Sequence, residues 1–200
     1  MLENNAISPD KTIRGVITPD KRLFDLLHNS KSLVKNKRII TPRLNMQDGL
    51  LTDRRVIFTS TVVNRGIDDV YQIIKDVEGF PKFMKWVKAI IIHERENHRA
   101  ISEWLVDFED AYLAWKQEEI YDDSREKISF NMLNGDFDGY CGEWNLSEMG
   151  NNKTLITLKA KFDWGMPNIE VLMGHILRRK ARYAMRTMLL AIKKEVGNVE

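Results

Sequence analysis

The hydrophobic and polar positions of the chain follow two different periods, one at its C-terminal end and one before it. From Pro167 to Val196, apolar residues recur at steps of three and four, as on one face of a long helix. The residues on this face are Met173, Leu177, Ala181, Ala184, Met185, Met188 and Ile192. A proline suits the first turn of such a helix, and Gly197 follows the last turn. Because a helix gains most of its stability by packing its apolar face, we expect this helix to lie against other elements.

Before this helix, the sequence has the pattern of β-strands. Seven segments of strand length are separated by turn-forming groups, and they span residues 56–63, 87–94, 100–108, 112–121, 127–133, 137–146 and 154–162. Two short helical segments, 67–77 and 80–86, follow the first strand. Because the links between the later strands are short, those strands should pair antiparallel as a meander. The pattern therefore predicts an α+β fold, in which one curved seven-stranded antiparallel sheet wraps around the C-terminal helix.

Alternation within the strands assigns their residues to two faces. One face is apolar and collects Trp104, Val106, Phe108, Ile128, Phe130, Met132, Tyr140, Trp144, Leu146, Ile156, Leu158, Ala160 and Phe162. The other face is charged and collects Glu103, Asp107, Lys127, Glu143, Lys159, Lys161 and Asp163. Segment 112–121 is different, because Gln117 and Glu119 share a face with Leu113 and Trp115. If this face is interior, burying the two polar groups unpaired would cost roughly a few kcal/mol, and a wet or ligand-filled interior would remove this cost.

Length and charge add limits to this picture. A chain of 200 residues suits one domain with a sizeable core, so we expect residues 54–200 to form a ligand-binding domain and residues 1–53 to form a partly irregular arm. The arm would dock on this domain or on a second subunit, as in a homodimer. With 31 Lys and Arg against 29 Asp and Glu, the net charge of +2 predicts no nucleic-acid partner.

The sequence also lacks the patterns of several other classes of protein. A single cysteine, Cys141, excludes an intramolecular disulfide and a multi-thiolate zinc site, and its alternation with Tyr140 should turn it away from the apolar face. No pair of histidines has a carboxylate at ligand spacing, so we expect no metal. No signal-like N-terminus is present, and no segment approaches the roughly 20 apolar residues of a spanning helix. We therefore expect a cytoplasmic protein without a membrane partner.

Three motifs carry a resemblance to a known family. Residues 69–83 (DVYQIIKDVEGFPKF), 134–137 (NGDF) and 142–144 (GEW) resemble, in this order, the START-like helix-grip (SRPBCC) proteins. Within these, the chain is similar to the polyketide cyclase/aromatase and coenzyme Q-binding branch, and the resemblance covers about residues 56–196. It implies a deep, mostly apolar cavity between the sheet and the C-terminal helix. In aromatase/cyclases, that cavity directs aldol ring closure and dehydration of a carrier-bound poly-β-ketone; in the coenzyme Q-binding relatives, it holds a quinone or lipid without chemistry.

The resemblance also implies roles for individual positions. Phe80 corresponds to an aromatic residue at the cavity mouth, Trp115 and Trp144 to cavity tryptophans, and Gln117 to a polar wall residue. Two positions depart from the pattern. Glu119 stands where an arginine is often proposed to polarise substrate carbonyls, and Ala184 stands where some members have an asparagine. We expect the ligand to be bound by Phe80, Phe83, Trp104, Phe108, Trp115, Phe130, Trp144, Met173, Leu177, Ala184 and Met188.

Glu119 is the candidate acid–base group. A carboxyl group in an apolar cavity could take an α-proton from a β-ketone and return a proton during dehydration. Alternatively, its strand lies at a rim, where Glu119 would be solvated or paired with a Lys or Arg. Gln117, Tyr140 and Tyr183 are candidate hydrogen-bond donors to carbonyl or enolate oxygens, although a tyrosine is often only a core residue with its hydroxyl at the surface.

Arg178, Arg179, Lys180 and Arg182 form the densest basic cluster. Such a cluster is usually a solvated helix face, but it is also suited to docking an acidic acyl carrier protein or ribosomal RNA. The sequence thus predicts either a cofactor-independent polyketide aromatase/cyclase or a non-catalytic quinone or lipid carrier. The interior pair Gln117 and Glu119 favours the enzyme, because an isoprenoid tail prefers apolar walls.

Overall fold

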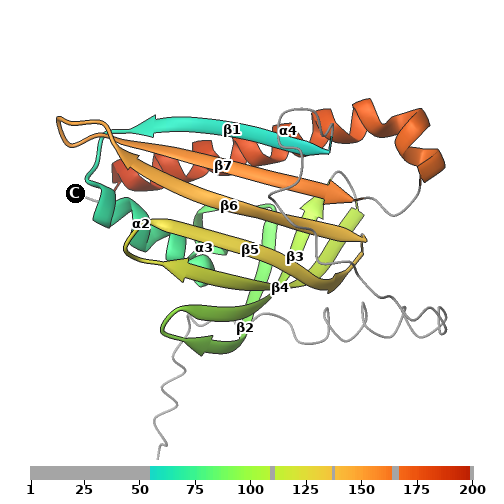
Figure 1. Cartoon of the computed structure of the whole chain (residues 1–200), viewed down its shortest axis with the longest axis horizontal. Helices are drawn as coiled ribbons and strands as arrows, with labels where there is room; N and C mark the ends of the chain where they lie inside the picture. The colour runs from blue at the N-terminus through green and yellow to red at the C-terminus, as the bar shows by residue number, and fades with distance from the viewer. Residues whose placement is uncertain (1–54, 109–110, 137, 164–166, 199–200) are drawn as a thin grey trace, which may run out of the picture. The chain divides into compact units, whose positions relative to one another are not determined.

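The computed structural model describes residues 55–108, 111–136, 138–163 and 167–198 (Figure 1). The elements are β1 (Val56–Val63), α2 (Ile67–Lys75), η2 (Val77–Gly79), α3 (Phe80–Phe83), β2 (Val87–Glu96), β3 (Arg99–Phe108), β4 (Ala111–Asp122), β5 (Lys127–Gly135), β6 (Gly139–Glu148), β7 (Thr154–Asp163) and α4 (Pro167–Asn198). The predicted arm of residues 1–53 lies outside the described residues and stays a prediction.

The seven strands form one antiparallel sheet in the order β1-β7-β6-β5-β4-β3-β2. Strands β2 to β7 are therefore a meander, and β1 pairs with the last strand, so that Ile57 is opposite Ala160. Each strand agrees with its predicted segment to within two residues. The predicted helix 67–77 is shorter, because Asp76 (φ −82°, ψ 65°) leaves the helical conformation and a 3-10 turn follows it. The C-terminal helix continues past Gly197 to Asn198.

Helix α4 packs along β1 and touches α2 (Figure 1). Its buried hydrophobic residues follow the expected helical steps, and they are Ala181, Met185, Leu189, Ile192 and Val196. Burying one large aliphatic side chain contributes about 1.5–3 kcal/mol, so this stripe accounts for much of the attraction between helix and sheet. None of the described helices has both the length and the apolar content that crossing a membrane requires.

Charged residues pair across strands on the face of the sheet opposite the cavity. Lys127 Nζ lies 2.6 Å from Glu143 Oε2, and Lys88 Nζ lies 3.1 Å from Asp107 Oδ2. Burial alone would raise the pKa of Glu143, but the hydrogen bond and the charge of Lys127 outweigh it and lower that pKa below its ordinary value. These pairs confirm the charged face that the alternation of residues predicts.

Gly142 leaves space on the sheet for the ring of Phe130. Gly142 pairs with Phe130 across β5 and β6, and a Cβ atom at Gly142 would overlap the Phe130 ring. The same Cβ would also overlap the carbonyl oxygen of Lys159 on β7. Because backbone and ring both occupy this space, the position has no room for a side chain.

Gly142→Ala should therefore destabilise the fold. Overpacking a well-filled site typically costs about 1–3 kcal/mol, and we expect a loss of this size in the free energy of unfolding. Urea denaturation followed by far-UV circular dichroism measures it. Gly197→Ala is the control, because nothing lies within 4 Å of a Cβ at that position, and its stability should be unchanged or slightly higher. Equal stability of the Gly142 variant and the wild type would contradict this account.

Candidate functional site

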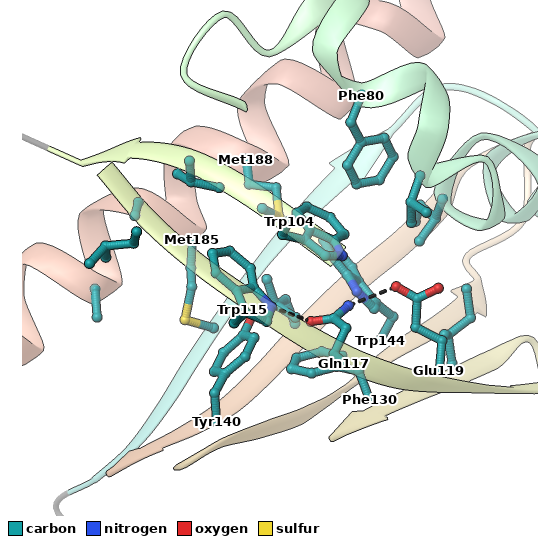
Figure 2. A pocket seen from close by; sticks show the side chains of 18 of the residues that line it. Phe80, Trp104, Trp115, Gln117, Glu119, Phe130, Tyr140, Trp144, Met185 and Met188 are labelled. Atoms are coloured by element: carbon teal, nitrogen blue, oxygen red, sulfur yellow. Dashed lines mark hydrogen bonds between the residues drawn. The ribbon is translucent and has the colours of Figure 1, made fainter. Parts of the chain in front are cut away.

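The sheet, the short helices and α4 enclose a cavity of about 120 Å³ (Figure 2). It is lined by Ile74, Val77, Phe80, Trp86, Trp104, Val106, Phe108, Leu113, Trp115, Gln117, Glu119, Tyr121, Ile128, Phe130, Tyr140, Trp144, Leu158, Phe162, Ala181, Ala184, Met185 and Met188. For comparison, an apolar cavity of about 150 Å³ can bind benzene. The space therefore suits about one aromatic ring, and a larger ligand requires movement of the lining side chains.

Aromatic rings in contact with one another form much of the wall. Trp104 and Trp115 are opposite residues of β3 and β4, and their rings stack at 5.5 Å with an interplanar angle of 13°. Phe80 meets Trp104 edge-on at 5.9 Å, and Tyr140 meets Trp115 edge-on at 5.9 Å. The ring of Tyr140 also lies 4.8 Å from that of Phe130. This wall presents flat faces and edges, to which a planar unsaturated ligand is suited.

One end of the cavity is polar, and its centre is the carboxylate of Glu119 (Figure 2). Glu119 Oε1 accepts hydrogen bonds from Ser102 Oγ at 3.0 Å and from Gln117 Nε2 at 2.7 Å. Glu119 Oε2 accepts a hydrogen bond from the hydroxyl of Tyr121 at 2.8 Å. The protein itself therefore supplies hydrogen-bond partners for Gln117 and Glu119, and these two groups are not buried unpaired.

The two tryptophans fix the direction of this network. Trp104 Nε1 donates to Ser102 Oγ at 2.8 Å, and an indole nitrogen cannot accept, so the hydroxyl hydrogen of Ser102 is left for Glu119. In the same way, Trp115 Nε1 donates to Gln117 Oε1 at 2.7 Å, so the amide nitrogen of Gln117 faces Glu119. The hydroxyls of Ser102 and Tyr121 and the amide of Gln117 all donate to the carboxylate of Glu119. The side chain at position 119 must therefore accept these hydrogen bonds.

Glu119 is buried, with 2% of its surface exposed. Among the described residues, no lysine, arginine or histidine forms an ion pair with it. Lys75 Nζ lies 5.2 Å from the centre of the Tyr121 ring, so this cation meets the ring and not the carboxylate. The alternative position at a solvated or ion-paired rim is therefore wrong. Burial and the nearby charge of Glu119 raise the pKa of Tyr121 above its ordinary value, so this phenol stays protonated and continues to donate.

Most of the predicted site residues meet in the cavity. Those that line it are Phe80, Trp104, Phe108, Trp115, Gln117, Glu119, Phe130, Tyr140, Trp144, Ala184 and Met188. Phe83 does not line it but packs edge-on against Phe80 at 5.6 Å. Leu177 is half-buried and does not reach the wall, and the side chain of Met173 lies outside the described part of the chain. Burial raises the pKa of Tyr140, so its hydroxyl stays protonated near neutral pH.

The expectation that Tyr183 faces the cavity is wrong. Its side chain is 72% exposed, whereas Met185 is buried and lines the cavity. Residues at positions i and i+2 of an α-helix point about 200° apart around its axis. Tyr183 must therefore point away from the cavity when Met185 points into it. The basic cluster is divided in the same way, since Arg179 and Arg182 are exposed while Arg178 and Lys180 are half-buried.

Sequence reasoning missed several cavity residues. Ile74 and Val77 come from α2 and η2, Trp86 precedes β2, and Tyr121 ends the polar row on β4. The helical spacing of Ile74 and Val77 indicated a buried face, but not a cavity. Ser102 had no signal of its own, because its importance comes from its position opposite Gln117 in the neighbouring strand.

The described residues contain no group of three His, Cys, Asp or Glu side chains arranged to hold a metal ion. Cys141 is buried and does not line the cavity, as its alternation with Tyr140 predicts. Burial raises the pKa of its thiol, which disfavours the nucleophilic thiolate.

Several solved structures share this architecture. Protein TTHA0849 from Thermus thermophilus is 23% identical, with a TM-score of 0.67 over 70% of this chain and 96% of the other. The Zhui aromatase/cyclase from Streptomyces sp. R1128 is 18% identical, with a TM-score of 0.62 over 72% and 93%. A START superfamily protein from Mycobacterium smegmatis is 15% identical, with a TM-score of 0.65 over 72% and 99%. These likenesses confirm the helix-grip fold.

The sequence identifies the family independently of these structures. No curated protein matches the chain. The family model described as polyketide cyclase / dehydrase and lipid transport matches residues 63–188, which include the short helices, β2 to β7 and most of α4. The chain therefore belongs to the polyketide cyclase / dehydrase and lipid transport family.

Proposed function

We propose that the protein is a cofactor-independent aromatase/cyclase, which directs aldol ring closure and dehydration of a carrier-bound poly-β-ketone. The observation that carries this proposal is the buried carboxylate of Glu119 at the polar end of a cavity walled by aromatic rings. Because none of the described cations pairs with Glu119, the carboxylate can take up a proton without breaking an ion pair. The flat aromatic walls suit both the unsaturated substrate and its aromatic product.

In the first step, Glu119 takes a proton from a methylene group that lies between two ketones. The resulting enolate carbon attacks a second ketone, a carbon–carbon bond forms, and the new alkoxide takes the proton back from Glu119. Removal of a further α-proton by Glu119 then expels hydroxide, which leaves as water with that proton. Glu119 is restored, and one water is lost. The second amide hydrogen of Gln117 and the hydroxyl of Tyr140 are the donors for the developing enolate oxygen.

Confinement contributes at least as much as proton transfer. Holding the two reacting carbons in contact can supply about 7–11 kcal/mol of the barrier to ring closure. The cavity has room for about one ring, so the part of the chain that closes must be bent inside it. Met185 and Met188 line the α4 side, and flexible methionine side chains can move to admit more of the substrate.

A second candidate function is non-catalytic binding of a quinone or lipid. It is favoured by the complete hydrogen bonding of Glu119, because Ser102, Gln117 and Tyr121 occupy it without any ligand. A carrier needs only an apolar space, and most of the lining provides this. The two functions differ in whether Glu119 exchanges protons with the ligand.

Glu119→Gln should abolish cyclisation and preserve binding, because glutamine has the same shape but cannot act as the base. We expect ring closure to slow by about 10²–10⁴-fold. Single-turnover conversion of a poly-β-ketone thioester, followed by liquid chromatography and mass spectrometry, measures it. Glu118→Gln is the matched control, since Glu118 pairs with Arg99 on the other face and should be neutral for turnover. Full turnover by the Glu119 variant would end the catalytic proposal.

Ser102→Ala should destabilise the fold and release the Trp104 ring from its fixed position. It leaves Trp104 Nε1 without its acceptor and removes one donor from Glu119, at a cost of about 1–3 kcal/mol. Urea denaturation measures the loss, and near-UV circular dichroism reports the released indole. The control is Ser60→Ala on the exposed side of β1, which should leave both measurements as in the wild type. An unchanged tryptophan signal in the Ser102 variant would show that the hydroxyl does not hold the ring.

The small molecules that co-purify with the protein distinguish the two functions. Solvent extraction of freshly purified protein, followed by mass spectrometry, should yield an oxygen-rich aromatic or polyketide compound, or no stoichiometric ligand. Boiled protein and an unrelated protein purified in the same way are the controls. A prenylated quinone or a lipid present at about one molecule per chain would favour the carrier function instead.

A further inference from the structure

The exposed side of α4 carries a row of cations, which we call the basic face. It consists of Arg179, Arg182, Arg186, Lys193 and Lys194, all of which are exposed. Within the described ranges of the chain, none of the five forms an ion pair or a side-chain hydrogen bond. At 1.5 Å per residue, the row is about 22 Å long. A protein with a net charge of only +2 thus concentrates unpaired positive charge on one helix.

Two apolar side chains lie within the same face. Tyr183 is 72% exposed and Leu190 is 61% exposed, and they are seven residues apart. With Arg186 and Lys193, they follow the steps 183, 186, 190 and 193, which alternate between three and four. This spacing forms a single seam along a helix, and it is the seam that a second helix covers when two helices pack side by side.

The opposite side of the same helix belongs to the cavity. Ala181, Ala184, Met185 and Met188 line it, within the stretch that carries the basic face. A partner on the basic face would therefore lie about one helix diameter, roughly 10 Å, from the bound substrate. A partner that docks here is close enough to deliver a tethered ligand.

We propose that the basic face docks an acidic helix of the acyl carrier protein that brings the substrate. The identity of this partner rests on the proposed function, whereas the acidic, helical character of the docked segment rests on the charges and spacing of α4. A membrane surface fits less well, because it takes up a broad apolar helix face, and the apolar face of α4 is packed in the core. The cations could bind the phosphates of an RNA, but an RNA backbone would give the exposed apolar side chains of Tyr183 and Leu190 no partner.

A binding measurement tests the surface without any chemistry. The probe is a purified bacterial acyl carrier protein bearing its phosphopantetheine arm, titrated calorimetrically at low salt. The triple variant Arg179→Glu, Arg182→Glu, Arg186→Glu should bind at least about tenfold more weakly, because like charges then face each other. Lys82→Glu, Lys85→Glu, Lys153→Glu is the matched control, since these exposed lysines lie elsewhere and the net charge changes equally. Its binding should equal that of the wild type, and added salt should weaken both.

A second binding experiment reverses the charges of the carrier protein. Carrier protein with three acidic helix residues changed to lysine should bind the triple variant better than the wild type, which also shows that the variant is folded. Tyr183→Ala with Leu190→Ala should weaken binding with little change in its salt dependence. Undiminished binding by the triple variant overturns the proposal. So does wild-type binding to anionic phosphatidylserine vesicles or to double-stranded RNA in the absence of carrier binding.

A carrier-free substrate separates this proposal from the proposed function. A poly-β-ketone on a short N-acetylcysteamine thioester needs no docking surface, so the triple variant should convert it at the wild-type rate and lose only carrier-dependent conversion. If the wild type binds the carrier through the basic face but converts neither substrate, the docking surface stands and the aromatase/cyclase function fails. If the triple variant converts both the carrier-bound and the carrier-free substrate at the wild-type rate, the aromatase/cyclase function stands and the docking surface fails.

Discussion

The site depends on the convergence of hydrogen-bond donors on one buried carboxylate. The indole nitrogens of the two tryptophans can only donate, and they donate to Ser102 and Gln117. These two side chains in turn donate to Glu119. Reversing any of these bonds would leave a buried donor facing a donor, which the low-dielectric interior penalises more strongly than water does. The same bonds hold Trp104 and Trp115 in their stacked positions. The shape of the cavity and the state of its polar end are therefore consequences of one arrangement.

The sheet makes this arrangement possible through its register. Trp104 is opposite Trp115 and Ser102 is opposite Gln117, so both pairs project from β3 and β4 to the concave side. A shift by one residue would place all four on the charged face, where Glu103 and Lys116 now lie. Gly142 has a similar role between β5 and β6, because the Phe130 ring occupies the volume that a side chain would fill. Function and stability thus depend on the same strand pairings.

Helix α4 connects the interior of the protein with its surface. Met185 closes the cavity on one side of the helix, and Tyr183 and Arg186 are exposed on the other. The sequence indicates that this helix has an apolar stripe, and the stripe is confirmed. It does not indicate how far around the helix the cavity wall extends, which is why the prediction for Tyr183 is wrong. A basic run that is contiguous in the sequence also divides in space, since neighbouring helix residues point about 100° apart.

The order of the elements, the strand bounds to within two residues and the placement of Gln117 and Glu119 on the same strand face as Trp115 all follow from the sequence alone. They do so because side-chain alternation and helical spacing are local properties of a backbone with few allowed conformations. The burial of Glu119 without an ion pair, and the choice of Ser102 as its partner, are visible only in the folded molecule. These facts depend on which strands become neighbours and on how α4 is rotated against the sheet. Contacts between residues far apart in the chain set both, and no local period records them.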